Sequence, residues 1–319
     1  PFTGRADACF NGNGVSGGPS GKVFFPSSQQ LYTVSSGTSH SAPGVSGGCA
    51  LLRQYFINHF SSPPSPAMTK AYLMNSTRYL TGLSANDNLW SNNQGMGGIN
   101  LGMAFDGTPR RLRDQNQADL FTASGQIRVF SGRVADTSKP FRVTLAWTDA
   151  PGSTVGAAYN NNLDLTVTIG GNTYFGNVFR GAYSITGGSA DPVNNVESVF
   201  LPVGTTGDFV VSITAANINS DGVPNNDQSL DQDFALVIYN SQAAAITPPR
   251  ISQVSLVGHS ITVQFDSVSG ATYTLQSKNS LLDSSWVSCS PRTSGTDATI
   301  SLVDTNALAP TRFYRVICE

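Results

Sequence analysis

The chain has 319 residues, a formal net charge of −2 and only 12% charged residues, about half the usual fraction. This length exceeds that of one ordinary domain, so two or three domains are expected. The near-neutral charge offers no broad basic face to a nucleic acid, and no apolar run approaches the roughly 20 residues that span a bilayer. Neither a nucleic acid nor a membrane is therefore an expected partner. Gly, Ser, Thr and Asn replace the missing charges, which is typical of secreted β-rich proteins and predicts an extracellular location.

The start of the chain and its cysteines give two further expectations. The chain begins at Pro1 without an initiator Met or a signal peptide, which indicates a processed product, a clipped product or a fragment. Four cysteines are too few for a disulfide scaffold, but Cys289 and Cys318 lie in one C-terminal segment and are candidates for a pair. Cys9 and Cys49 either pair or stay free. A buried thiol is favoured at Cys49 because it lies in an apolar helical run.

Helical patterns are confined to the first third of the chain. Residues 1–36 are rich in Gly, Ser and Asn and predict loops with one short strand. Apolar residues spaced by three and four then predict a helix that starts near Pro43 and runs to Phe60. The stretch 61–66 ends this helix. A second helix is predicted from about Pro66 to Tyr79, because a proline suits a first helical turn, and Gly-rich sequence follows it.

The rest of the chain has the pattern of β structure. From Arg113 to Asn240, short alternating runs are separated by clusters of Gly, Asn and Asp, which predicts an antiparallel sandwich or jelly roll. Residues 243–249 contain Ala and Pro and are predicted as a linker. Alternating runs return over about 250–319, a length that fits a small β-sandwich module. The domain boundaries are therefore placed at 1–107, 108–242 and 250–319.

One short segment carries residues suited to nucleophilic chemistry. Residues 36–47 are Ser-Gly-Thr-Ser-His-Ser-Ala-Pro-Gly-Val-Ser-Gly. A serine in the first turn of a helix has its hydroxyl beside unpaired backbone N–H groups, which with the helix dipole can stabilise a developing oxyanion. Ser39 is in such a position, and Gly37 and Thr38 form the turn before it. The alternative is that Ser39 is only a helix N-cap, since Gly-Thr-Ser is common in loops.

This segment resembles the nucleophile motif of the subtilisin-like serine peptidases (subtilases, S8 type), Gly-Thr-Ser-x-x-x-Pro-x-Val-x-Gly. All its fixed positions are present, as Gly37, Thr38, Ser39, Pro43, Val45 and Gly47. Residues 92–100 resemble the Gly-rich closing segment of these catalytic domains. Three later stretches resemble the jelly-roll β-barrel domain attached to a subset of bacterial subtilases, namely 143–151, 161–165 and 194–197. The resemblance covers about residues 22–240.

The resemblance implies a fold and an activity. Residues 1–107 would be the C-terminal portion of a subtilisin-like α/β catalytic domain, followed by two all-β domains, a jelly roll and then a small β-sandwich. The activity would be that of a serine endopeptidase, a secreted hydrolase that cleaves protein or peptide substrates through an acyl-enzyme on Ser39. No organic cofactor is implied.

The rest of a catalytic triad has no match in this chain. The family order is Asp, His, Ser, so both partners of Ser39 are expected upstream, where the sequence has no histidine. His40 is adjacent to Ser39, His59 lies about 30 Å along the predicted helix, and His259 belongs to the last module. We therefore expect the isolated chain to be inactive, with its own N-terminal fragment as a second candidate partner beside the substrate.

Oxygen-bearing side chains are dense in the middle of the β region and are candidates for Ca²⁺ ligands. The resemblance implies structural calcium here, with Asp149, Asp164 and Glu197 as the main ligands and Asn162 and Asn194 in support. They belong to a cluster that also contains Asn160 and Asp191. The alternative is that Asn and Asp serve only to form turns. A second acidic run, Asp221, Asp227, Asp231 and Asp233, is predicted to lie in a solvated loop.

A second function remains open from the sequence. The β domains would belong to a non-catalytic binding or structural protein that recognises a surface polymer, and the Ser39 segment would be a remnant. Four aromatic residues are candidates for stacking on sugars, although such residues more often lie in cores: Tyr159, Tyr174, Phe175 and Trp286.

Overall fold

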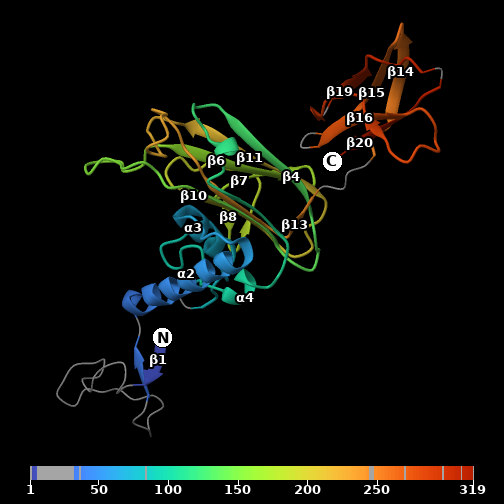
Figure 1. Cartoon of the computed structure of the whole chain (residues 1–319). Helices are drawn as coiled ribbons and strands as arrows, with labels where there is room; N and C mark the ends of the chain where they lie inside the picture. The colour runs from blue at the N-terminus through green and yellow to red at the C-terminus, as the bar shows by residue number, and fades with distance from the viewer. Residues whose placement is uncertain are drawn as a thin grey trace, which may run out of the picture.

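The computed structural model describes residues 2–5, 32–35, 37–82, 85–243, 248–268, 271–296, 298–309 and 311–318. Two short strands, β1 (Phe2–Arg5) and β2 (Tyr32–Ser35), pair antiparallel ahead of the first long helix. The helices are α2 (Thr38–Phe60), α3 (Pro66–Asn75) and the short α4 (Leu101–Ala104), with a 3₁₀ turn η1 (Gln117–Asp119). Helices therefore occupy the first part of the described chain, and strands follow (Figure 1).

Helix α2 begins earlier than the sequence predicts. Its first residue is Thr38, so Pro43 lies inside the helix and not at its start. A proline has no N–H, so the carbonyl four residues earlier, that of Ser39, loses its helical donor. The chain leaves the helix at Ser61, which adopts a left-handed conformation with φ 57° and donates its N–H to the Ile57 carbonyl. Only three residues of this helix are buried: Gly48, Leu52 and Phe56.

Helix α3 begins as predicted and ends earlier than predicted. Pro66 occupies its first turn, and the Ser65 hydroxyl caps it by accepting the Met68 N–H at 2.9 Å. The helix ends at Asn75, four residues before the predicted Tyr79. The reason lies in the polar residues that follow. Ser76 and its neighbour bond back to carbonyls of the last turn, which competes with helical continuation.

The predicted change from helical to β structure is confirmed, and most of the strands between Arg110 and Gln242 form two antiparallel sheets. The four-stranded sheet has the order β10 (Val196–Leu201), β5 (Phe141–Ala146), β12 (Ala235–Tyr239), β3 (Arg110–Asp114). The five-stranded sheet has the order β13 (Ser241–Gln242), β4 (Ile127–Val134), β11 (Asp208–Asn217), β6 (Asn162–Ile169), β7 (Asn172–Phe175). A small hairpin, β8 (Phe179–Arg180) with β9 (Tyr183–Ser184), lies beside β10.

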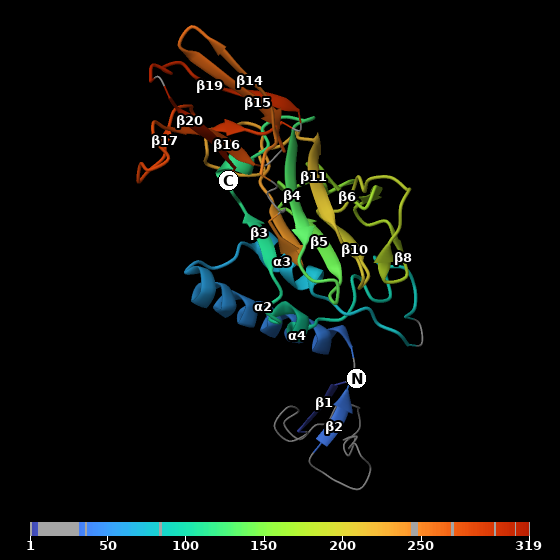
Figure 2. The same cartoon turned by 90° about the vertical axis from the view of Figure 1, so that its right-hand side faces the viewer.

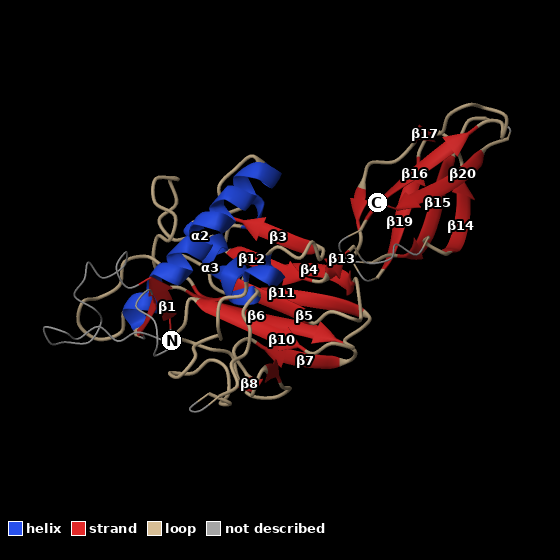
Figure 3. Ribbon diagram, turned by 90° about the horizontal axis from the view of Figure 1, so that it is seen from below, coloured by secondary structure: helices blue, strands red, loops and turns tan. Residues whose placement is uncertain are grey.

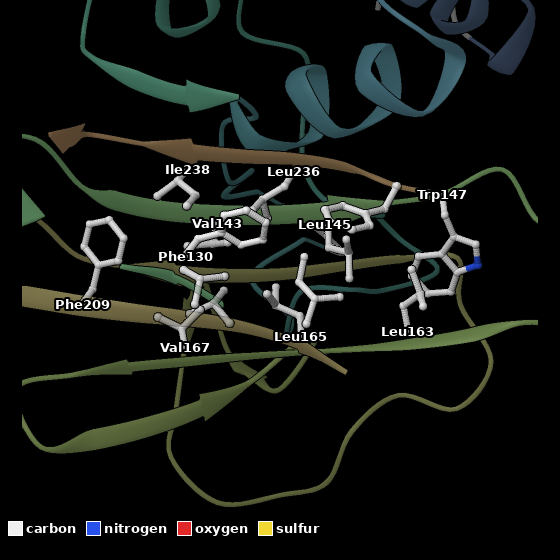
Figure 4. Packing of buried hydrophobic residues seen from close by; sticks show 14 of the residues in the cluster. Phe130, Val143, Leu145, Trp147, Leu163, Leu165, Val167, Phe209, Leu236 and Ile238 are labelled. Atoms are coloured by element: carbon white, nitrogen blue, oxygen red, sulfur yellow. The ribbon is translucent and has the colours of Figure 1, made fainter. Parts of the chain in front are cut away.

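The main hydrophobic core lies between these two sheets. In β6 the residues Leu163, Leu165, Val167 and Ile169 are buried and alternate with more exposed ones, the period-two pattern of a strand with one buried face. Figure 4 shows these side chains meeting those of β5, β11 and β12, with Trp147 at one end. At about 25 cal/mol per Å² of apolar surface, this core is the main source of stability of the β region.

The outer face of the four-stranded sheet packs against the helices. Ala146, Val196, Ala235 and Val237 form one buried cluster with residues of α2 and α3. Strand β12 is consequently buried on both faces. Helix α3 lies between α2 and the sheet (Figure 3). The segment with the nucleophile motif is thus joined to the β region by a shared core.

The last module consists of two further sheets around a separate small core. One contains β14 (Ile251–Val257), β15 (Ser260–Asp266) and β19 (Thr299–Asp304). The other contains β16 (Thr272–Lys278), β17 (Val287–Ser288), β18 (Thr293–Ser294) and β20 (Phe313–Cys318). The core residues are Val263, Phe265, Tyr273, Leu275 and Leu302.

The cysteine expectations are partly corrected. Cys289 and Cys318 are free thiols, so their predicted pairing is wrong. The Cys289 thiol instead donates to the Leu275 carbonyl at 3.3 Å. Cys49 is also free and is half-buried, whereas Cys9 lies outside the described residues. No helix in the described ranges is both long and apolar enough to cross a membrane.

Candidate functional site

Ser39 is an exposed residue in the first turn of α2. The preceding Gly37 has φ 146°, a backbone conformation that residues with a Cβ rarely adopt. The Gly37 carbonyl accepts the N–H groups of His40 and Ser41 at 3.1 and 3.3 Å, which starts the helix. The Ser39 hydroxyl therefore lies at the positive end of a 23-residue helix, where first-turn N–H groups lack helical partners.

The surroundings of Ser39 are open in the part of the chain that the structure describes. Residues 41–47 are all exposed, including the apolar Val45. Pro43 cannot donate the usual helical hydrogen bond to the Ser39 carbonyl. Among the described residues, Ser39 is thus an exposed serine at a helix start.

The histidines lie where the sequence predicts. His40 follows Ser39 directly, and side chains one residue apart on a helix point in different directions. His59 lies in the last turn of the same continuous helix, about 30 Å from Ser39 at 1.5 Å per residue. Its ring stacks on Tyr55 at 4.1 Å, and its Nδ1 lies 2.9 Å from the Tyr55 carbonyl. His259 lies in the β14–β15 turn of the last module, beyond the sheets from α2 (Figure 1).

Among the predicted calcium ligands, Asp149 accepts hydrogen bonds from backbone N–H groups of a loop. Its Oδ2 accepts the Asn160 N–H at 2.6 Å, and its Oδ1 accepts the N–H groups of Ala150 and Asn161 at 2.9 Å. Both oxygens therefore hold the segment between β5 and β6 in place. These bonds match the turn-forming alternative for Asp149.

Asn162, Asp164 and Glu197 lie together where β6 meets β10. Asn162 donates its amide to Asp164 at 2.9 Å. Glu197 has no exposed surface, and its Oε2 accepts the Leu165 N–H at 2.7 Å while its Oε1 has no hydrogen-bond partner. Burial raises the pKa of Glu197 to about 9. The Leu165 N–H opposes this rise, and the charges of Asp164 and Asp191 add to it.

Asp191 connects the remaining candidate, Asn194, to this group. It accepts the side-chain amides of Asn194 at 2.7 Å and Asn177 at 2.8 Å. Burial acts to raise the pKa of Asp191, but these hydrogen bonds outweigh it and lower the pKa. Asp191 belonged to the cluster noted in the sequence without being selected, and Asn177 was missed because it lies in a separate segment.

This group is only a partial match to a metal site. In the described residues, no group of three or more His, Cys, Asp or Glu is arranged to hold a metal ion. The feature that fits a cation is the unpartnered, buried Oε1 of Glu197, because a buried carboxyl oxygen without a donor costs about 1–3 kcal/mol.

The second acidic run is not a solvated loop. Asp221 and Asp227 are exposed, but Asp231 and Asp233 are buried. Asp231 accepts the N–H groups of Gly222 and Val223, and these hydrogen bonds hold the loop before it in place. Burial, together with the charges of Asp114 and Asp231, raises the pKa of Asp233 to about 6.

The aromatic candidates for sugar stacking do not gather in one place. Tyr174 packs against the main core and Phe175 is half-buried, whereas Tyr159 is exposed in the loop before β6. Trp286, in the last module, lies under two cations, Arg315 at 4.5 Å and Lys278 at 5.2 Å from its ring centre. Tyr174 and Phe175 share β7, but Tyr159 and Trp286 lie on other segments, so the four residues do not form a common platform.

Comparison with known proteins supports the assignment of the first segment. Residues 7–97 match the family model described as "Subtilase family". A search of curated proteins gives no match. Among solved structures, the Bacillus licheniformis lipase BlEst2 in propeptide form is similar at 8% identity with a TM-score of 0.23, over 66% of this chain and 40% of that one. A GH2 β-galacturonidase from Eisenbergiella tayi is similar at 12% identity with a TM-score of 0.18, over 57% of this chain and 29% of that one.

The two structural similarities are too low to support any argument about fold or activity. This chain spans less than half of either of those proteins. The family match is different, since it includes every position of the motif around Ser39 as well as both packed helices. Residues 7–97 of this chain are therefore similar to the subtilase family.

Proposed function

We propose that this chain supplies the nucleophile of a subtilisin-type serine endopeptidase, which cleaves protein or peptide substrates through an acyl-enzyme on Ser39. The observation that carries the proposal is the exposed Ser39 hydroxyl in the first turn of α2, directly after Gly37, inside the segment that matches the subtilase family. A helix start provides N–H groups and a positive dipole end for the oxyanion of an acyl-transfer reaction.

The reaction needs a base that this chain does not place near Ser39. In the proposed mechanism Ser39 Oγ attacks the peptide carbonyl and gives its proton to a histidine, which a carboxylate orients. None of the three histidines of the chain is in a position to act. We therefore propose that the catalytic His and Asp belong to polypeptide upstream of this sequence, that the isolated chain is inactive, and that an N-terminal fragment is its natural partner.

The β regions have a supporting role in this proposal. We propose that residues 108–242 form a jelly roll that stabilises the catalytic segment, and that 243–249 link it to a small β-sandwich at 250–319. The shared core between α3 and the four-stranded sheet supports the first role. A secreted location accords with the low charge of the chain.

We also propose a structural Ca²⁺ near Glu197 and Asp164, in a secondary role. The ion would give the Glu197 Oε1 a partner and would keep neighbouring carboxylates ionised. It takes no part in peptide cleavage.

A peptidase assay tests the main proposal. The chain is mixed with the polypeptide that supplies the His and Asp, and hydrolysis of a quenched fluorescent protein substrate is followed. Activity that appears only in the mixture and disappears in Ser39→Ala supports the proposal. A mixture that binds but never hydrolyses would favour the non-catalytic alternative.

A further inference from the structure

A cavity of about 540 Å³ lies at the end of α2 remote from Ser39. Its walls come from the last turns of α2, the start of α3 and the strand β3, which lie together in Figure 2. This volume is within the range of small-ligand pockets. Phe60 on its wall is 21 residues from Ser39 along the helix, or about 30 Å, so the cavity is separate from the proposed nucleophile.

Aromatic side chains form the apolar part of this cavity. Tyr55, Phe56 and Tyr72 lie against one another, with ring centres 5.5 Å apart for Phe56 and Tyr72 and 6.4 Å apart for Tyr55 and Tyr72. The ring centre of Phe60 lies 5.0 Å from that of Phe56, and the Phe60 side chain is 52% exposed. An aromatic wall that still exposes half of one ring suits a large apolar side chain of a ligand.

Three side chains of strand β3 line this cavity. Residues at alternate positions of a strand share a face, and here Arg110, Leu112 and Asp114 all line the cavity. The cavity therefore has a cation at one end of the strand, an apolar centre and a carboxylate at the other end.

The two charged residues are not equally available. The Arg110 guanidinium donates to the carbonyls of Thr108 and Met103 and to Asp106, and it lies over the Tyr72 ring at 5.1 Å. Its charge is thus already paired. Asp114 accepts the Ser65 N–H at 3.0 Å through Oδ2, whereas its buried Oδ1 has no hydrogen-bond partner. No ion pair with a described residue neutralises Asp114, so the cavity wall carries a carboxylate charge that favours a cationic ligand group.

We propose that this cavity binds a peptide segment in which a large apolar side chain stands next to a basic one. The apolar side chain occupies the space between Tyr55, Phe60 and Leu112. The ammonium or guanidinium group of the basic side chain pairs with the Asp114 carboxylate on the cavity wall. Binding needs no catalytic base, so it does not depend on the chemistry of Ser39.

The test uses the full 319-residue chain carrying Ser39→Ala, so that no peptide can be hydrolysed. Isothermal titration calorimetry compares three blocked dipeptides at millimolar concentration: acetyl-Phe-Arg-amide, acetyl-Phe-Gln-amide and acetyl-Ala-Arg-amide. We expect saturable binding of the first, with at least about tenfold weaker binding of each of the others, because a charged hydrogen bond and a buried ring each contribute this much or more.

Two variants locate the binding. Asp114→Asn keeps an oxygen for the Ser65 N–H but removes the charge, and it should weaken binding of acetyl-Phe-Arg-amide about tenfold. Ser62→Trp adds a ring at an exposed position on the rim and should abolish binding. Asp208→Asn removes the same charge from an exposed site elsewhere and should change nothing. Equal affinity for all three peptides, unchanged affinity in Asp114→Asn, or no binding at all would overturn the proposal.

Discussion

Arg142 in β5 connects the end of α3 to the four-stranded sheet by a hydrogen bond to the Asn75 carbonyl. Its guanidinium donates to the Asn75 carbonyl at 3.0 Å and to the Thr77 carbonyl at 2.7 Å, and it lies over the Phe200 ring at 4.4 Å. The Asn75 amide in turn donates to Thr144 of the same strand at 3.1 Å. This contact joins the helical segment to the β region by buried polar bonds in addition to apolar packing.

The first prediction concerns this contact. Arg142→Met keeps the apolar stem but leaves two buried carbonyls without donors, so the free energy of unfolding should fall by about 2–4 kcal/mol. Urea unfolding followed by tyrosine fluorescence and circular dichroism measures the loss. Arg133→Met, which breaks an exposed pair with Asp208, is the matched control and should have no measurable effect. Equal free energies of unfolding for the two variants would show that the Arg142 hydrogen bonds do not stabilise the contact between α3 and the sheet.

The second prediction tests the packing of α2. Leu52 is fully buried against α3, while its neighbour Leu51 is 54% exposed. Leu52→Ala should reduce the free energy of unfolding by about 2–5 kcal/mol because it leaves a cavity, and Leu51→Ala should have little effect. Thermal unfolding of the two variants in parallel gives the comparison. The arrangement of α2 on α3 would be refuted by a larger loss in Leu51→Ala than in Leu52→Ala.

The third prediction concerns pH. Burial raises the pKa of Glu197 from its ordinary 4.5 to about 9, so the unfolded chain gives up this proton more readily than the folded one. The contribution to stability is therefore fully present below pH 4.5 and is lost as the pH rises through 9. Each unit of difference corresponds to about 1.4 kcal/mol, so the loss should amount to several kcal/mol.

Glu197→Gln provides the control for this effect. The Gln oxygen can still accept the Leu165 N–H but has no proton to lose. Denaturant unfolding between pH 5 and pH 9 in the presence of EGTA should show a falling stability for the wild type and a flatter profile for the variant. Parallel profiles for the two proteins would mean that Glu197 is not the group responsible.

The fourth prediction concerns calcium. If a structural Ca²⁺ lies near Glu197, EGTA should lower the melting temperature of the wild type, and added Ca²⁺ should restore it. Asp164→Asn should remove most of this response, while Asp149→Asn should keep it, because both Asp149 oxygens are bonded to its own loop. A melting temperature that is the same with EGTA and with Ca²⁺ would count against the ion.

Local features of the fold could be predicted from the sequence where one residue type determines the geometry. Pro66 after Ser65 marks the start of α3, and alternating apolar residues mark β6. The Gly-Thr-Ser segment places Ser39 at a helix start, as the structure shows. These features depend on neighbours in the chain, so a short window contains the information.

Features that depend on distant partners could not be predicted. Asp231 is buried because its carboxylate accepts the N–H groups of Gly222 and Val223 in the preceding loop. A polar stretch of sequence does not predict these hydrogen bonds. Glu197 looks like a ligand in the sequence, yet its environment is set by Leu165 and Asp191 on other segments. Apolar spacing alone places the start of α2 near Pro43, and only the Gly-Thr-Ser segment marks the helical residues before that proline.

The central claim is that Ser39 is a competent subtilase nucleophile that lacks its base within this chain. Intact-mass spectrometry after exposure to a fluorophosphonate probe tests it most directly, on the isolated chain and on the protein that includes the upstream polypeptide. The account predicts no adduct on the isolated chain, and one adduct at Ser39 when the His and Asp are present, which is absent in Ser39→Ala. Rapid labelling of Ser39 in the isolated chain, or no labelling in the longer protein, would contradict it.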